Sequence, residues 1–87
     1  FAYEPVWSIG TNKIPKMYDL KNTIKFIKSE FKKTFKTEKS PKVLYGGSVN
    51  DKNISLFSSI SEIDGFLIGG ASQSSKKFID IVKNYYK

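Results

Sequence analysis

The chain has 87 residues, of which 39% are hydrophobic and 15% aromatic, and this composition suits a small globular domain rather than a disordered segment. All fifteen basic residues are lysine, and the lack of Arg, His and Cys excludes disulfides, a zinc site and a Cys- or His-dependent nucleophile within these residues. The net charge of +7 would attract polyanions, but base recognition and bidentate phosphate contacts favour Arg, so a lysine-rich solvent face is the better interpretation.

Three short apolar runs, each followed closely by Gly or Pro, are typical of buried parallel strands and lie at residues 1–3, 43–45 and 66–68. A long amphipathic segment follows the first run, and its apolar stripe consists of Leu20, Ile24, Ile27, Phe31 and Phe35. Further helices are predicted at about 51–58 and 76–86. The chain order is therefore β-α-β-α-β-α, an α/β fold without an internal domain boundary.

Strands that alternate with helices form a parallel sheet through right-handed crossovers, so the loops after the three strands converge at one edge. With all three helices on one face, the other face and both edges of the sheet would be exposed, which a soluble chain tolerates badly. We therefore expect either part of a larger sheet or a piece that assembles with something else. The apolar start at Phe1, without Met, also suggests the interior of a longer chain.

Each converging loop carries residues suited to binding a ligand. The first loop is 4–11, the second contains Gly46-Gly47-Ser48, and the third contains Gly69-Gly70-Ala71-Ser72. Glycines after a strand allow a tight turn and close approach to a ligand, and the N–H groups at the next helix start attract anions. The glycine pairs thus predict a phosphate site, while Ser48 would either contact the phosphate or cap the helix at Asn50 or Asp51.

Glu4 is the carboxylate at a strand end beside these loops, and the following Pro5 restricts its backbone to extended conformations. Local chemistry alone favours an ordinary solvent-facing Glu. However, Trp7 and Ile9 are large apolar residues in a loop that should be wet, and they resemble a lid. A carboxylate beneath such a lid would be desolvated, which would raise its basicity and suit it to removing a proton from a small phosphorylated carbonyl compound.

Three segments together closely resemble the triosephosphate isomerase family, in the family's order and spacing. They are Ala2-Tyr3-Glu4-Pro5-Val6-Trp7-Ser8-Ile9-Gly10-Thr11, then Tyr45-Gly46-Gly47-Ser48-Val49, and Ile63-Asp64-Gly65-Phe66-Leu67-Ile68-Gly69-Gly70-Ala71-Ser72. The resemblance covers the chain from Phe1 to its end and implies strands six to eight, with their helices, of a (β/α)8 barrel. A complete barrel has about 250 residues, so residues 1–87 would be an incomplete single domain.

The resemblance implies a role for each matching residue. Glu4 would be the catalytic base that interconverts dihydroxyacetone phosphate and D-glyceraldehyde 3-phosphate through an enediolate, and residues 5–14, with Pro5 and Trp7, would be the mobile lid. The remaining implied roles are phosphate binding by Gly10, Ser48, Gly69 and Gly70, latching of the closed lid by Tyr45 and Ser48, and dehydration of Glu4 by Ile9 and Leu67.

The chain departs from the family's pattern in two places, and it lacks several residues of the family's active site. Asn12 stands where glycine is common, and because Asn tolerates positive φ better than most residues, we expect closure of the lid to survive. Ile14-Pro15 stands where a small-residue hinge is common, and Pro15 is expected to stiffen the hinge and to change the opening rate of the lid. The family's electrophilic His, its Lys and its substrate-contacting Asn belong to earlier strands. We therefore expect the 87 residues alone neither to fold stably nor to catalyse.

The resemblance also implies the setting of the complete protein: a homodimeric cytoplasmic enzyme of glycolysis, gluconeogenesis and the pentose phosphate route, with a small phosphorylated triose as substrate. It implies no cofactor, no metal and neither a nucleic-acid nor a membrane partner; no apolar run approaches the roughly 20 residues of a membrane span, and no leader marks the chain for secretion. Two alternatives remain: another phosphate-binding (β/α)8 barrel enzyme, and a non-catalytic basic binding module.

Overall fold

The computed structural model describes residues 1–11 and 13–87. Its strands are β1 (Ala2–Tyr3), β2 (Leu44–Gly47) and β3 (Gly65–Ile68), and its α-helices are α1 (Met17–Phe35), α2 (Ile54–Ser58) and α3 (Ser75–Tyr85). Two 3-10 helices that the sequence did not predict, η1 (Val6–Ser8) and η2 (Gly70–Gln73), follow β1 and β3. The predicted β-α-β-α-β-α order is confirmed, and it is consistent with part of a (β/α)8 barrel.

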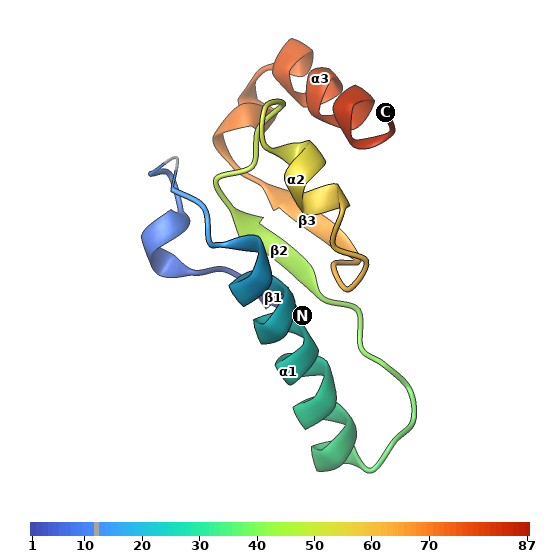
Figure 1. Cartoon of the computed structure of the whole chain (residues 1–87). Helices are drawn as coiled ribbons and strands as arrows, with labels where there is room; N and C mark the ends of the chain where they lie inside the picture. Colours follow the sequence, from blue (N-terminus) through green and yellow to red (C-terminus); the bar gives the residue numbers. More distant parts are fainter. Residues whose placement is uncertain (12) are drawn as a thin grey trace.

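The strands form one parallel sheet in the order β1-β2-β3, and the three α-helices connect and follow them (Figure 1). The register pairs Tyr3 with Tyr45 and Tyr45 with Phe66, so these three aromatic residues share one face. Because side chains alternate along a strand, the other face carries Ala2, Leu44, Gly46, Gly65 and Leu67. This register decides which loop residues lie beside one another at the carboxyl ends of the strands.

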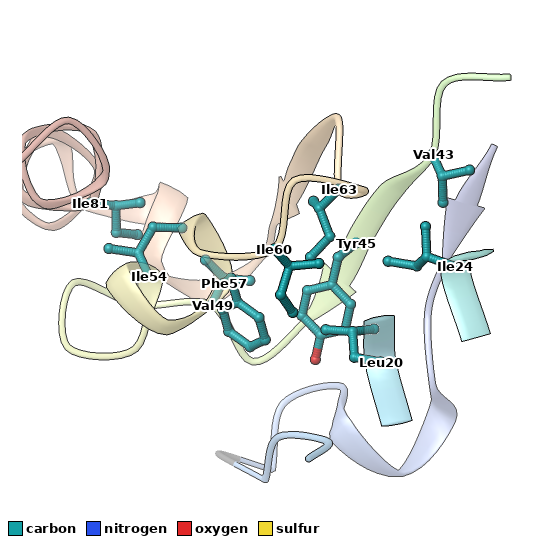
Figure 2. Packing of buried hydrophobic residues seen from close by; sticks show 10 residues of the cluster. All are labelled: Leu20, Ile24, Val43, Tyr45, Val49, Ile54, Phe57, Ile60, Ile63 and Ile81. Carbon is teal, nitrogen blue, oxygen red and sulfur yellow. The ribbon is translucent and has the colours of Figure 1, made fainter. Parts of the chain in front are cut away.

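The hydrophobic core lies between the helices and the aromatic face of the sheet (Figure 2). The predicted stripe of α1 is buried at Leu20 and Ile24 and becomes more exposed toward Phe35, near the end of the helix. Lys36 ends α1 in the left-handed region, with φ of 50°. The buried cluster consists of Leu20, Ile24, Val43, Tyr45, Val49, Ile54, Phe57, Ile60, Ile63 and Ile81.

Two predicted boundaries around β2 and α2 are wrong. The second helix begins at Ile54 rather than Asp51, because the Asn50 side chain accepts hydrogen bonds from the backbone N–H groups of Lys52 and Asn53, both at 2.9 Å, and holds a turn there. Gly46 and Gly47 were expected to follow the second strand, but they are its last two residues and pair with β3. Among the described residues, no helix has the length and apolarity needed to cross a membrane.

An ion pair ties α1 to the start of β3. The Lys28 Nζ lies 2.9 Å from Asp64 Oδ2 and donates a hydrogen bond of 2.7 Å to the Glu62 carbonyl. Asp64 Oδ2 also accepts a hydrogen bond of 2.8 Å from the Val43 N–H. The Asp64 carboxylate therefore connects the start of β3 both to α1 and to the residue before β2. The Val43 N–H, followed by Lys28, holds the pKa of Asp64 below its ordinary value of 3.8, although partial burial opposes this.

The lowered pKa of Asp64 predicts a pH-dependent contribution to stability. The folded state prefers the ionised carboxylate, so the contribution is complete above the unfolded pKa and is lost as the pH falls through the folded pKa. We expect Asp64→Asn to lower the free energy of unfolding of the complete protein by about 1 kcal/mol at pH 7, after allowance for solvent screening. Urea denaturation at pH 7 and in acid checks this, with the exposed loop residue Glu38→Gln as the control. An equal loss at both pH values would contradict the prediction.

Candidate active site

The register brings Glu4 to the carboxyl edge of the sheet beside β2 and β3. Glu4 directly follows β1 and continues the row in which Gly46 pairs with Leu67. A Cβ atom added at Gly46 would lie 2.8 Å from Glu4 Cγ and 3.0 Å from Glu4 Oε1. The Glu4 carboxylate therefore lies against the bare backbone of β2, on the same side of the sheet as Leu67.

The predicted apolar cover over Glu4 is absent from the described part of the chain. Glu4 is exposed, and Ile9 and Leu67 are themselves 52% and 41% exposed. The expectation that these two residues dehydrate the carboxylate concerns the closed, complete site and stays a prediction. Trp7, which lies in η1, is likewise 52% exposed. In this conformation, Glu4 is open to solvent at the carboxyl edge of the sheet.

The segment after β1 is a compact turn rather than an extended loop. Pro5 is buried, and the Pro5 carbonyl accepts hydrogen bonds from the Ser8 N–H and the Ser8 hydroxyl, both at 2.9 Å. Thr11 Oγ1 donates to the Trp7 carbonyl at 2.8 Å, and Gly10 adopts a φ of 68°, in the region that favours glycine. These internal bonds fix the shape of the turn.

Ser8 attaches this turn to the β2 loop. Its side chain is buried, and its carbonyl accepts a 2.5 Å hydrogen bond from the Ser48 hydroxyl. Ser48 was predicted either to contact phosphate or to cap the following helix. The N-cap position of α2 is instead Asn53, whose Nδ2 donates 2.7 Å to the Ser48 carbonyl. The Ser48 hydroxyl thus joins the first loop to the second.

Tyr45 lies beneath the same contact. Its ring is fully buried against Phe57, and its hydroxyl oxygen points toward the segment that follows β1 (Figure 2). The Tyr45 hydroxyl lies beside Ser8 but has no hydrogen bond of good geometry to any described residue. Burial raises the pKa of Tyr45, and the neighbouring Ser8 hydroxyl partly opposes this. The Tyr45 hydroxyl therefore lies buried beneath the turn, beside Ser8.

The third loop exposes the two glycines that were predicted to bind phosphate. Gly69 precedes η2 and Gly70 begins it, and a Cβ atom on either residue would meet nothing within 4 Å. The loop is held by Ser72, whose hydroxyl and N–H donate to the Gly69 carbonyl at 2.6 and 2.9 Å. Ser74 then caps α3 by accepting from the Lys77 N–H at 3.3 Å. The open space around both glycines leaves their backbone accessible to a ligand.

The sequence interpretation missed the contributions of Ser8 and Gly46. Ser8 is a small polar residue between two large apolar ones, Trp7 and Ile9, and this contrast was the available signal for a buried anchor. No local signal linked Gly46 to Glu4, because the contact depends on strand register. Of the two lid departures, Pro15 is buried and Ile14 packs on the core, whereas Asn12 lies outside the described residues.

The sequence of the chain is similar to one known protein family. The sequence model of the family described as triosephosphate isomerase matches residues 1–85. Curated proteins with the name triosephosphate isomerase include those of Dictyoglomus turgidum, 47% identical over 85 residues, and Candida albicans, 45% identical over 85 residues; each match covers 95% of this chain. That of Chlamydia abortus is 40% identical over 88 residues, or 99% of this chain.

The chain spans about a third of the length of these relatives, 34% for Candida albicans and Dictyoglomus turgidum and 35% for Chlamydia abortus. The three segments that carry the resemblance all lie within the matched region, and in the structure they form the three loops at the carboxyl edge of the sheet. From its match to the family over residues 1–85, the chain belongs to the triosephosphate isomerase family.

Proposed function

We propose that the protein containing these residues is a triosephosphate isomerase, which interconverts dihydroxyacetone phosphate and D-glyceraldehyde 3-phosphate. The observation that carries the proposal is the position of Glu4, whose carboxylate is exposed beside Gly46 at the edge where the three loops meet. Family membership supplies the reaction, and this geometry supplies a base with room for a small substrate. The chain itself contributes the base, the lid and the phosphate loops.

In the proposed reaction, the Glu4 carboxylate takes a proton from the substrate carbon next to the carbonyl. The electron pair of the broken C–H bond forms the C–C double bond of an enediolate, and the carbonyl oxygen gains the negative charge. Glu4 then returns the proton to the former carbonyl carbon, while the hydroxyl group on the first carbon loses its proton to become the new carbonyl and the former carbonyl oxygen gains one to become a hydroxyl. A group from outside these 87 residues would carry the proton between the two oxygens, so the enzyme is unchanged at the end. Because the sequence has no His, the group that polarises the carbonyl comes from outside these 87 residues.

The phosphate group is proposed to lie between the loops. The Ser48 hydroxyl and the backbone N–H groups of Gly69 and Gly70 would hold it from β2 and β3, and the Gly10 N–H would reach it from the closed lid. The open surroundings of Gly69 and Gly70 and the positive φ of Gly10 support this role. For Ser48, phosphate binding requires the hydroxyl to leave the Ser8 carbonyl, to which it donates in this conformation.

Closure of the lid is proposed to complete the site. Tyr45 and Ser48 would latch residues 5–14, and Ile9 and Leu67 would then cover Glu4 and exclude water from the reaction. The contact from Ser48 to Ser8 supports a latch at this point, and the buried Tyr45 hydroxyl lies close enough to join it. The complete enzyme is proposed to be a cytoplasmic homodimer without a cofactor, acting in glycolysis, gluconeogenesis and the pentose phosphate route.

The proposal is tested with the complete protein and a panel of phosphorylated sugars. Rapid interconversion of the two triose phosphates is expected, whereas turnover of a different sugar phosphate alone would favour another phosphate-binding barrel enzyme. The isolated 87-residue chain is expected to be inactive, because it lacks the polarising group. If the complete protein has no activity and binds nucleic acid in a salt-dependent way, the basic binding module replaces this proposal.

A further inference from the structure

Gly46 and Gly47 are adjacent in β2, and they open space on opposite faces of the sheet. A Cβ atom on Gly47 would lie 2.5 Å from both the Ser8 Oγ and the Tyr45 hydroxyl, on the helix-covered face. For Gly46, the nearest atoms all belong to Glu4, on the other face. Among the described residues, the glycine with positive φ is Gly10, so backbone conformation does not explain glycine at either position.

The contact at Gly46 is too close to accept a methyl group without movement. The added Cβ would lie 2.8 Å from Glu4 Cγ, 3.0 Å from Oε1 and 3.3 Å from Cδ, and ordinary van der Waals contact begins near 3.4 Å. The Glu4 backbone cannot readily give way, because the next residue is the buried Pro5, which restricts it to extended conformations. The carboxylate itself would therefore have to move.

We propose that Gly46 is a positioning residue for Glu4: the missing side chain leaves the space in which the Glu4 side chain lies against β2. This inference rests on the proposed function, in which Glu4 is the base, and it assigns to Gly46 a role other than phosphate binding. A misplacement of about 1 Å can lower the rate of an enzyme by roughly 100-fold, because proton transfer depends steeply on geometry. A methyl group at Gly46 would impose a displacement of this kind.

The kinetic test is Gly46→Ala in the complete protein. We expect kcat to fall by about 100-fold, with KM for the triose phosphate and inhibition by inorganic phosphate unchanged. In a Glu4→Gln background, Gly46→Ala should lower kcat little further, because the group that it displaces no longer acts as a base. An increase in KM with normal kcat, or a full additional loss of kcat in the double variant, would overturn the inference and favour a phosphate-loop role.

Gly47→Ala is the matched control, since it adds the same methyl group to the next residue but on the opposite face. Its effect on kcat and KM should persist in the Glu4→Gln background, because Ser8 and Tyr45, not Glu4, receive the contact. If the wild-type protein is active and Gly46→Ala has an unaltered kcat, the inference about Gly46 is wrong, but the proposed function is not affected. An inactive wild-type protein contradicts the proposed function instead.

A stability measurement tests the contact without relying on activity. Gly46→Ala is expected to lower the urea midpoint of the complete protein, and the same substitution in a Glu4→Ala background should leave that midpoint unchanged, because Cγ and the carboxylate are then absent. If Gly46→Ala alone does not fold, the Glu4→Ala/Gly46→Ala protein is expected to restore folding. An equal loss of stability in both backgrounds would show that Gly46 makes room for something other than Glu4.

Discussion

Glu4→Gln is expected to lower kcat of the complete protein by about 100- to 10,000-fold, the usual contribution of a positioned general base. Gln has nearly the same shape as Glu, so it retains the contact with Gly46, but its neutral amide cannot take a proton from the substrate. KM should change little, because the proposed phosphate contacts are made by Ser48, Gly69 and Gly70 from the other two loops.

Steady-state kinetics with dihydroxyacetone phosphate measure this effect. The matched control is Glu38→Gln, which removes an equal charge from an exposed position in the loop before β2 and should leave kcat unchanged. A competitive phosphate-containing inhibitor should bind both variants with wild-type affinity. Near-normal turnover in Glu4→Gln would place the base elsewhere, whereas a large increase in KM with normal kcat would make Glu4 a binding residue.

The elements with strong local patterns were predicted correctly from the sequence. The stripe through Leu20 and Ile24 has helical spacing, and both residues are buried against the sheet, because an amphipathic helix places such residues on one face. The apolar runs at 43–45 and 66–68 overlap β2 and β3, because a short apolar run followed by glycine is typical of a buried strand. Periodicity therefore sufficed for the element order and for the edge at which the three loops meet.

The features that were mispredicted depend on contacts between distant segments. Gly46 and Gly47 were assigned to a turn because glycine commonly follows a strand, yet both pair with β3 and both make room for groups from the first loop. Glu4 lies far from Gly46 in the sequence, so no local pattern around Gly46 indicates their contact. The start of α2 was misplaced because the side chain of Asn50 holds a local turn that competes with the helix.

The lid shows a different limit of the sequence pattern. Apolar Trp7 and Ile9 predicted a cover over Glu4, but hydrophobicity alone does not specify which of several conformations a loop adopts. In this structure, the 3-10 turn at Val6–Ser8 exposes both apolar side chains, and its anchor is the buried Ser8. The cover over Glu4 therefore remains a prediction for the closed state.

Phe57→Ala is expected to lower the free energy of unfolding of the complete protein by about 3–5 kcal/mol, the usual cost of removing a buried phenyl ring. Phe57 is fully buried in α2, and its ring centroid lies 4.7 Å from that of Tyr45 and 6.1 Å from that of Phe66. The substitution leaves a cavity between α2 and the aromatic face of the sheet, which the rigid strands cannot easily close.

Urea denaturation of the complete protein measures the loss, and Phe26→Ala is the matched control. Phe26 is 65% exposed on α1, so its removal should change the free energy of unfolding by no more than about 0.5 kcal/mol. Because the Phe57 ring supports Tyr45, whose hydroxyl lies beside Ser8, the cavity should also loosen the attachment of the lid and raise KM in the protein that remains folded. Equal stability of the two variants would mean that α2 does not support the sheet at Tyr45. The proposed effect of Phe57 on the attachment of the lid at Ser8 would then be wrong.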